Sequence, residues 1–275
     1  PPEKDILQRR RFMMMTEKWL MLPVAEIVLI LAMFFSFTAS MLCWISYYPK
    51  FRDRIYTFRG VSAAFYGSIV PILGILIGFL SSDVWESNKK AAEIVREEAA
   101  ELTSIYGLVA VSDLPYVEIS RGIRNYVSAV VEKEWPAMSK GEAAADAEIA
   151  QDDLIRIAAH VCAPQKIEIE CNHTLSDIAL KVRETRSNRL KLSTDNTETI
   201  KWASVLFLAL IAQISIASVH LENIRPQIAS LAIFTSAIVV VLSLIALHEL
   251  PFAPPIVVSS APLADLLKVI PENGS

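Results

Sequence analysis

Four long stretches without a single charged residue constrain this chain more than any other feature of its sequence. They cover residues 27–48, 60–82, 202–219 and 226–247. A helix needs about 20 apolar residues to cross a hydrocarbon core of roughly 30 Å, and uncharged stretches of that length are rare in soluble domains. The sequence therefore predicts an all-α membrane protein with four transmembrane helices.

Aromatic residues near the ends of these stretches support the prediction, because Trp and Tyr favour the headgroup region of a bilayer. They are Trp19, Trp44, Tyr47, Tyr48, Tyr56, Trp85 and Trp202. The first stretch is too long for a signal peptide and is followed by basic residues, so we interpret it as a retained helix. The formal net charge of -4 gives no indication of a nucleic-acid partner.

The spacing of the four stretches predicts the domain organisation. Only six residues separate the last two stretches, which indicates an antiparallel hairpin. We expect an N-terminal segment that can include residues added for expression, two transmembrane helices, a helical extramembrane domain on the side of both termini, the hairpin and a tail. These parts span residues 1–22, 23–82, 83–201, 202–248 and 249–275 respectively.

The extramembrane stretch has a helical pattern throughout. Apolar residues recur at three- and four-residue intervals from Ala92 to Val109, which predicts that the second transmembrane helix continues beyond the membrane. The third transmembrane helix should have a similar extension from Thr174 onwards. Trp135-Pro136 predicts the end of a helix, and Ser139 followed by Glu142 resembles a capping box that opens the next one.

The two helical extensions carry opposite charges. Acidic residues on the first are Glu93, Glu97, Glu98 and Glu101, and basic residues on the second are Arg183, Arg186, Arg189 and Lys191. One interpretation is a pair of solvated faces or an interhelical row of salt bridges. The other is the wall of a vestibule that tunes the entry of ions.

The second transmembrane stretch is the most informative. Its glycines, Gly67, Gly74 and Gly78, lie on one side and permit close approach of another helix. Pro71 removes a backbone donor in mid-membrane. An adjacent face carries Ser68, Ile72, Ile75, Phe79 and Ser82, with Asp83 following. Such a face can line a pore with a hydrophobic constriction. Ordinary packing or lipid contact is the alternative.

No motif for catalysis or nucleotide binding is present, so we expect neither an enzyme nor a cofactor. Thiol and imidazole groups, the ligand types that zinc prefers, gather at His160, Cys162, Cys171 and His173. Their spacing matches no common zinc motif. Free thiols are expected if the domain is cytoplasmic, and a disulfide between Cys162 and Cys171 if it is external.

Several short motifs follow one another between residues 60 and 265. They are Gly78-Phe79, Trp85, Val95, Glu98-Ala99, Leu102, Tyr126, Glu134-Trp135-Pro136, Arg183, Arg186 and Pro251-Phe252. In this order the motifs resemble the bestrophin-like domain family, mostly bacterial membrane proteins distantly similar to bestrophin anion channels.

The resemblance implies a pentameric channel whose second helices surround the pore, with an apolar neck before and at the Gly-Phe pair. Carried over by that motif, Phe79 and Ile75 are neck residues. Pro71 departs from the family pattern, because a bulky apolar residue is expected there. The resemblance also implies a cytoplasmic helical domain in a bacterial inner membrane. No acidic cluster follows the fourth helix, so calcium gating is not implied.

We therefore expect a homo-oligomeric ion channel, with membrane lipid and small inorganic ions as partners and no nucleic acid. Conduction of anions rests on the resemblance alone. The alternative is a non-conducting scaffold or sensor whose helical domain binds a partner. A secondary transporter would require broken helices and an intramembrane ionisable group, and only Pro71 fits.

Overall fold

The computed structural model describes residues 24–48, 63–110, 116–160, 168–194 and 199–271. Within these ranges every regular element is helical. Four helices are long and apolar enough to cross a membrane: α2 (Val24–Tyr47), α4 (Ala63–Ala110), α9 (Thr199–Val219) and α10 (Ile224–Leu247). The predicted all-α membrane fold is confirmed.

The chain divides into two compact units, which are described separately below. The first, the transmembrane unit, contains residues up to Glu86 together with Asn196–Glu249. The second, the helical domain, contains Ser87–Asp195 and Leu250–Ser275. The helical domain therefore includes the C-terminal segment, a grouping that the sequence alone did not indicate.

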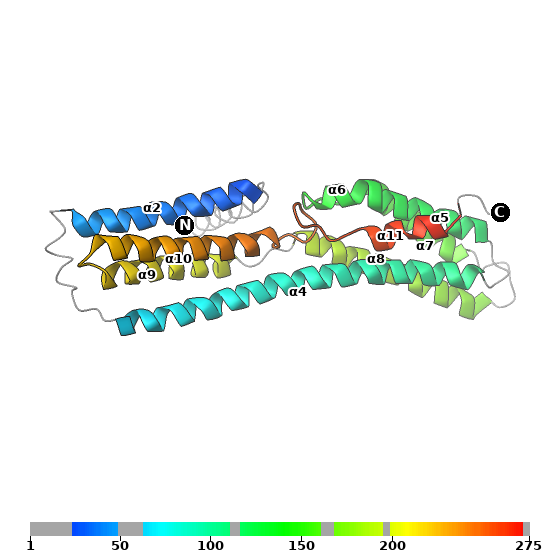
Figure 1. Ribbon diagram of the computed structural model, residues 1–275. Helices are drawn as coiled ribbons and strands as arrows, with labels where there is room; N and C mark the ends of the chain where they lie inside the picture. The colour runs from blue at the N-terminus through cyan, green and yellow to red at the C-terminus, as the bar shows by residue number, and fades with distance from the viewer. Residues whose placement is uncertain (1–23, 49–62, 111–115, 161–167, 195–198, 272–275) are drawn as a thin grey trace, which may run out of the picture. The chain divides into compact units, whose positions relative to one another are not determined.

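In the transmembrane unit, α2, α9 and α10 run side by side (Figure 1). The buried face of α2 carries Ile27, Leu31 and Phe35, whereas Met33 and Phe37 are exposed. Lipid is as apolar as these side chains, so burial alone gives little drive for helix association in a membrane. Close packing and interhelical hydrogen bonds must provide the specificity.

Two buried glutamines provide such hydrogen bonds. Gln213 on α9 donates to Thr235 Oγ1 on α10 at 3.0 Å, and its Oε1 accepts from Thr38 Oγ1 on α2 at 2.7 Å. Gln227 on α10 donates to Ser46 Oγ on α2 at 3.2 Å and to the backbone oxygen of α9 residue Ala217 at 2.9 Å. Each amide thus joins all three helices.

The helical domain is built from the extramembrane part of α4 and shorter helices. These are α5 (Tyr116–Ala129), the π-helix η2 (Val130–Glu134), α6 (Trp135–Met138), α7 (Ala145–His160) and α8 (Glu168–Thr194). Helix α7 packs against both α5 and α8. Most of the apolar stripe predicted on α4 is buried here, with Val95, Leu102 and Val109 almost completely covered.

The predicted continuation of the second transmembrane helix is confirmed, because α4 runs unbroken from Ala63 to Ala110. The corresponding extension of the third is described as two helices. Helix α8 ends at Thr194 and α9 begins at Thr199. The junction, 195–198, lies outside the described residues.

The predicted helix end at Trp135-Pro136 is wrong. Helix α5 passes into η2, where the N–H of Trp135 donates to the carbonyl of Val130, five residues earlier, and α6 follows with Pro136 in its first turn. Proline has no backbone N–H, but an N–H in the first turn of a helix has no acceptor within that helix, so its absence costs little there. The wider π-turn therefore lets the chain continue in the same direction.

The predicted capping box at Ser139 and Glu142 is also wrong, because these residues close α6. The N–H of Gly141 donates to the Met138 carbonyl at 3.0 Å and that of Glu142 to the Ala137 carbonyl at 3.1 Å. Gly141 has a positive φ of 72°. This is the Schellman arrangement, which needs a left-handed residue and so favours glycine. The next helix, α7, begins only at Ala145.

The C-terminal segment packs on the helical domain through α11 (Ala261–Ala264) and α12 (Leu266–Val269). Arg124 Nη1 on α5 donates to the carbonyls of Leu267 at 2.8 Å and Ile270 at 2.6 Å. Phe252 meets the ring of Trp135 edge-on, with centroids 5.6 Å apart.

Candidate functional site

The membrane half of α4 has one packed face and one open face. Leu73, Leu80 and Val84 are buried against the transmembrane unit. The three predicted neck residues point the other way: Ile72, Ile75 and Phe79 are 55%, 61% and 66% exposed. The structure thus brings the predicted neck residues onto one open side of a single helix.

The residues predicted to flank the neck are also accessible. Ser68, Pro71 and Ser82 are exposed, and Pro71 lies inside α4 without ending it. Proline has no N–H to offer the carbonyl four residues earlier, so the ladder of helical hydrogen bonds is loosened at this turn. Asp83 is half-exposed and pairs with Lys201 of α9 at 2.7 Å.

The three glycines in the membrane half of α4 face open space within the described part of the chain. A methyl group added at Gly67, Gly74 or Gly78 would meet no atom within 4 Å. The close helix approach that their spacing predicts is therefore not made by any described helix of the same chain. It remains a prediction for contact between copies.

A cluster of polar and aromatic side chains lies where α4, α9 and α10 leave the apolar stretch. The Trp202 indole N–H donates to Glu249 Oε2 at 3.3 Å, and Glu249 is almost completely buried. Trp85 of α4 stacks on the His248 imidazole, with centroids 5.1 Å apart and planes at 19°. Sequence analysis identified the two tryptophans but neither His248 nor Glu249, which only the fold brings to them.

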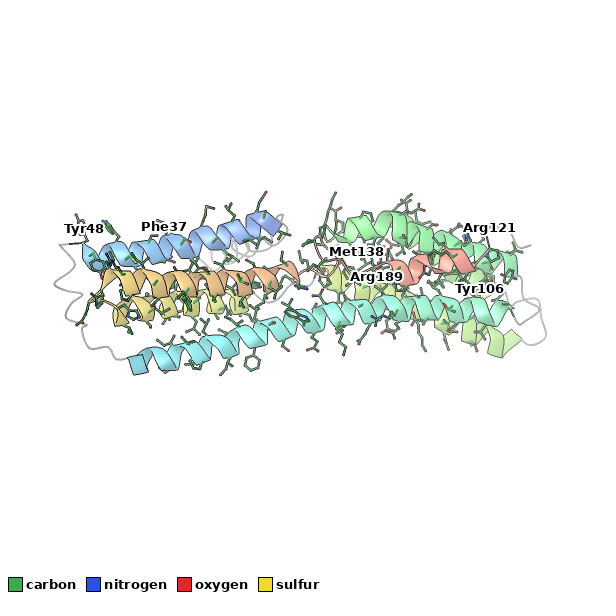
Figure 2. All side chains as sticks on the ribbon, in the orientation of Figure 1. Phe37, Tyr48, Tyr106, Arg121, Met138 and Arg189 are labelled. Carbon is green, nitrogen blue, oxygen red and sulfur yellow. The ribbon has the colours of Figure 1, made fainter. Side chains whose placement is uncertain are left out.

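The helical domain contains a buried ionic network that sequence analysis predicted only in part. Arg189 of α8 is fully buried and is labelled in Figure 2. Its Nε donates to Glu98 Oε2 of α4 at 2.7 Å, and its Nη2 donates to Glu134 Oε1 of the π-helix at 2.8 Å. Arg186 donates to the other oxygen of Glu134. Tyr126 of α5 donates to Glu98 Oε1 at 2.5 Å.

The network balances two guanidinium groups with two carboxylates. Burial acts to lower the pKa of Arg189, but the neighbouring Glu98, Tyr126 and Glu134 outweigh it, so this pKa is raised above its ordinary value. Burial, together with the Glu98 carboxylate, also raises the pKa of Tyr126. Both side chains therefore keep their protons at any physiological pH.

Part of this network was visible in the charge pattern of the two extensions. The interhelical salt-bridge interpretation is confirmed for Glu98 and Arg189. Other members of the two charge runs form surface pairs instead. Glu93 pairs with Lys89 of the same helix, and Arg183 pairs with Asp152 of α7 at 3.5 Å. The π-helix supplies Glu134, and no sequence signal predicted that turn.

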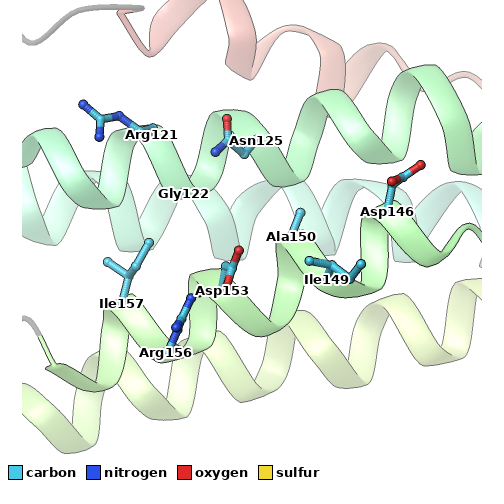
Figure 3. A pocket seen from close by; sticks show the side chains of 9 residues that line it. All are labelled: Arg121, Gly122, Asn125, Asp146, Ile149, Ala150, Asp153, Arg156 and Ile157. Atoms are coloured by element: carbon cyan, nitrogen blue, oxygen red, sulfur yellow. Dashed lines mark hydrogen bonds and ion pairs between the residues drawn. The ribbon is translucent and has the colours of Figure 1, made fainter.

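A groove of about 240 Å³ lies between α5 and α7 (Figure 3). It is lined by Arg121, Gly122, Asn125, Asp146, Ile149, Ala150, Asp153, Arg156 and Ile157. Most of its charges are balanced locally, since Asp146 pairs with Lys133 and Arg156 pairs with Asp153. Ile149, by contrast, is an exposed apolar side chain.

The predicted metal ligands fall largely outside the part of the chain that the structure describes. Cys162 lies in an undescribed range, and only the backbone is described at Cys171 and His173. The described residues contain no group of three potential ligands. The zinc and disulfide alternatives for these residues therefore stay predictions.

The span layout and the motif residues agree with a comparison against known families. A family model for the bestrophin-like domain matches residues 33–263, most of the chain. The chain belongs to the bestrophin-like domain family. No curated protein and no solved structure gives a significant match. This member of the bestrophin-like family is therefore a multi-pass membrane protein, and its individual activity has to be argued from its own residues.

Proposed function

We propose that this bestrophin-like protein is the subunit of an oligomeric ion channel, in which α4 lines an axial pore and Ile72, Ile75 and Phe79 form an apolar neck. The observation that carries the proposal is the open apolar face of α4. Three bulky side chains project from one side of a helix whose opposite side is packed. When such faces surround a pore, they narrow it, and the pore can close to ions when water leaves the apolar constriction.

The stoichiometry, ion and orientation of the proposal follow from the family. A pentamer, a preference for anions, and a cytoplasmic helical domain in a bacterial inner membrane are what the bestrophin resemblance supports. Gly67, Gly74 and Gly78, which no other described residue approaches, also favour assembly, because they leave room for a second copy to approach α4. An apolar neck selects among ions by the free energy needed to remove their water, and it distinguishes poorly between anions and cations.

The deciding experiment is flux of halides and of alkali cations into liposomes that contain the purified protein. Replacing Ile75 and Phe79 together by Ala widens the neck and lowers the dewetting barrier, so flux should rise. The ranking of ions in the same assay gives the selectivity, and the mass of the detergent-solubilised protein gives the subunit number.

A matched control separates the neck from general effects of trimming apolar side chains in the membrane. Phe207 on α9 and Ile233 on α10 are 66% and 72% exposed, much like Phe79 and Ile75. The Phe207→Ala plus Ile233→Ala variant should leave flux unchanged. Equal increases in both double variants would place the neck elsewhere, and no flux from any folded oligomer would remove the channel proposal.

The side on which the helical domain lies can be tested independently. Lys140 is exposed in the turn after α6. A single cysteine at this position, in a chain whose three native cysteines are replaced by Ser, should react with a membrane-impermeant maleimide only after the cells are opened. Labelling in intact cells would reverse the proposed orientation.

The alternative function is a non-conducting scaffold or sensor. The feature that favours it is the groove between α5 and α7, which is lined by Ile149, 62% exposed, and by Arg121 (Figure 3). A partner helix with an apolar and an acidic side chain would fit that lining. Two results together would support this alternative: the Ile149→Ser variant loses the binding of a partner, and the wild-type protein gives no ion flux.

A further inference from the structure

The groove between α5 and α7 in the helical domain has an apolar part built from small and branched side chains. Ile157 of α7 reaches across to Gly122 of α5, where an added methyl group would lie 3.1 Å from Ile157 Cδ1 (Figure 3). Ala150 and Ile149 continue this lining along α7, and Ile149 is 62% exposed. Covering this apolar surface favours a ligand with an aliphatic chain, because it removes the surface from water.

The α5 wall of the same groove carries hydrogen-bond donors. Arg121 and Asn125 are four residues apart and therefore neighbours on one helix face. Both are exposed, and neither forms a hydrogen bond or ion pair with any residue that the structure describes. A guanidinium group offers five N–H donors and a side-chain amide offers two. These donors are therefore available to a ligand.

The acidic residues of the groove, by contrast, already have partners. Asp146 Oδ2 lies 2.8 Å from Lys133 Nζ, and Asp153 pairs with Arg156 three residues further along α7. Of the charged residues that line the groove, Arg121 is the one without a partner among the described residues. An anion therefore gains more from this lining than a cation does.

The size and chemistry of the groove define the class of ligand. Its volume of about 240 Å³ is below the roughly 300–1,000 Å³ of pockets for drug-sized ligands, so the ligand is small. A planar carboxylate matches the fork of an arginine side chain and can also accept from an amide. A monocarboxylate with a short branched chain combines this group with an apolar body that fits Ile149.

We propose that the groove between α5 and α7 binds a small aliphatic carboxylate, whose charged end is held by Arg121 and Asn125 and whose chain packs on Ile149 and Ile157. The site does not depend on ion conduction, because every lining residue belongs to the helical domain. It also differs from the scaffold alternative, in which a side chain of a partner helix fills the groove. Here the carboxylate is a free molecule in solution.

Isovalerate is the probe for this site, because it joins a carboxylate to a short branched chain. Its binding to the full-length protein in lipid nanodiscs can be followed by saturation-transfer NMR, with the signal of empty nanodiscs subtracted. We expect saturable binding in the millimolar range. Isovaleramide has the same shape but no charge, so it should bind about fivefold more weakly.

Three variants locate the bound probe. Arg121→Gln removes the charge and should weaken the binding of isovalerate about five- to tenfold. Ile149→Ser removes an apolar contact and should weaken it about two- to fivefold. Arg96→Gln is the matched control, because Arg96 is an exposed arginine of α4 that does not line the groove, and it should bind like the wild type. Circular dichroism checks that all three variants are folded.

Several results would overturn the proposal. They are the absence of saturable binding to the wild type, equal affinity for isovaleramide, and unchanged affinity in Arg121→Gln or Ile149→Ser. A helical peptide that carries Glu and Leu one turn apart distinguishes the two sources of a carboxylate. If this peptide binds the wild type and isovalerate does not, the groove serves a partner helix and the free ligand is excluded.

Discussion

Arg189 is a fully buried guanidinium whose charge is matched by Glu98 and Glu134. A buried ion pair contributes little net stability, because the cost of removing both charges from water offsets their attraction. Removing one partner is different, since it leaves an uncompensated charge in the core. The network therefore acts chiefly to fix which helices meet: α4, the π-helix and α8 are joined through one side chain.

Arg189→Met should destabilise the helical domain by about 3–5 kcal/mol, because it leaves two buried carboxylates without their common partner. Arg183→Met is the matched control. Arg183 pairs with Asp152 on the surface, where a salt bridge contributes only about 0–1 kcal/mol. Denaturant unfolding monitored by circular dichroism gives both values, and equal effects of the two substitutions would contradict the role assigned to the network.

Glu101 predicts a pH dependence of stability. Burial is the main cause that raises its pKa above the ordinary 4.5; Glu97 and Glu98 add to the effect, and a hydrogen bond from Thr185 opposes it. A carboxyl whose pKa is raised in the folded state contributes stability that is fully present below the unfolded pKa and is lost as pH rises through the folded pKa. The wild-type domain should therefore lose stability from this group between mildly acidic and neutral pH.

The measurement is the difference in melting temperature between wild type and Glu101→Gln. The glutamine oxygen can still accept from Thr185 Oγ1, which lies 3.2 Å from Glu101 Oε1 in the wild type. The melting temperature of Glu101→Gln should rise relative to that of the wild type as pH increases from about 4 to about 7, because the glutamine cannot ionise. A difference in melting temperature that stays constant over this pH range would show that the burial of Glu101 is too slight to affect the stability of the domain.

Among the helices, the size of the side chains at a contact decides how closely two backbones can approach. Gly122 of α5 faces α7, and a methyl group there would lie 3.1 Å from Ile157 Cδ1 and 3.3 Å from Leu154 Cδ1. Gly107 of α4 faces open space, with no atom within 4 Å of an added methyl group. The two glycines thus have opposite environments in equally helical segments.

Gly107→Ala should stabilise the domain by about 0.5–1 kcal/mol, the usual gain from replacing glycine by alanine inside a helix. Gly122→Ala receives the same gain in helix propensity but must displace two side-chain ends, and overpacking costs about 1–3 kcal/mol. We expect it to be neutral or destabilising. Thermal unfolding of both variants provides the comparison, and an equal gain in the two would mean that α5 and α7 are not closely packed.

The π-helix shows how an element outside ordinary patterns serves the core. It allows Pro136 to follow α5 without a break and places Glu134, fully buried, beside Arg186 and Arg189. A break after α5, as the sequence suggested, would have separated Trp135 from the helix that carries Tyr126. Single π-turns of this kind recur at functional sites.

At the scale of the whole molecule, the chain leaves the helical domain, forms a hairpin in the membrane and returns to the same domain. Leu250–Ser275 is grouped with Ser87–Asp195 rather than with the spans that precede it. Phe252, Leu263 and Ile270 are buried in the core of the helical domain. The described C-terminal segment, residues 250–271, is therefore part of the fold of the helical domain.

A chain ending at Glu249 should keep its transmembrane unit but lose a stable helical domain. Burying each large apolar side chain contributes about 1.5–3 kcal/mol, and several such losses approach the whole stability of a domain, about 5–15 kcal/mol. Limited proteolysis should then cleave within 87–195, whereas a chain ending at Pro271, which keeps every described contact, should resist. Equal resistance of the two chains would contradict the assignment of this segment to the domain.

The membrane class, the four spans, the helical character of the extramembrane part and the family could all be predicted from the order of the amino acids. These follow from local properties: the length of uncharged stretches, the period of apolar residues and the order of short motifs. The shared face of Ile72, Ile75 and Phe79 was also predictable from helical periodicity, whereas only the structure shows that no described helix covers it.

Contacts between residues distant in the sequence became visible only in the folded chain. The partners of Arg189 and Gln213, the stack of His248 on Trp85 and the return of the C-terminal segment join residues 22 to 178 positions apart. Periodicity shows which side of a helix is apolar but not which helix covers it. It also cannot show where a π-turn will shift the hydrogen bonding and so place Glu134 beside the two arginines that it contacts.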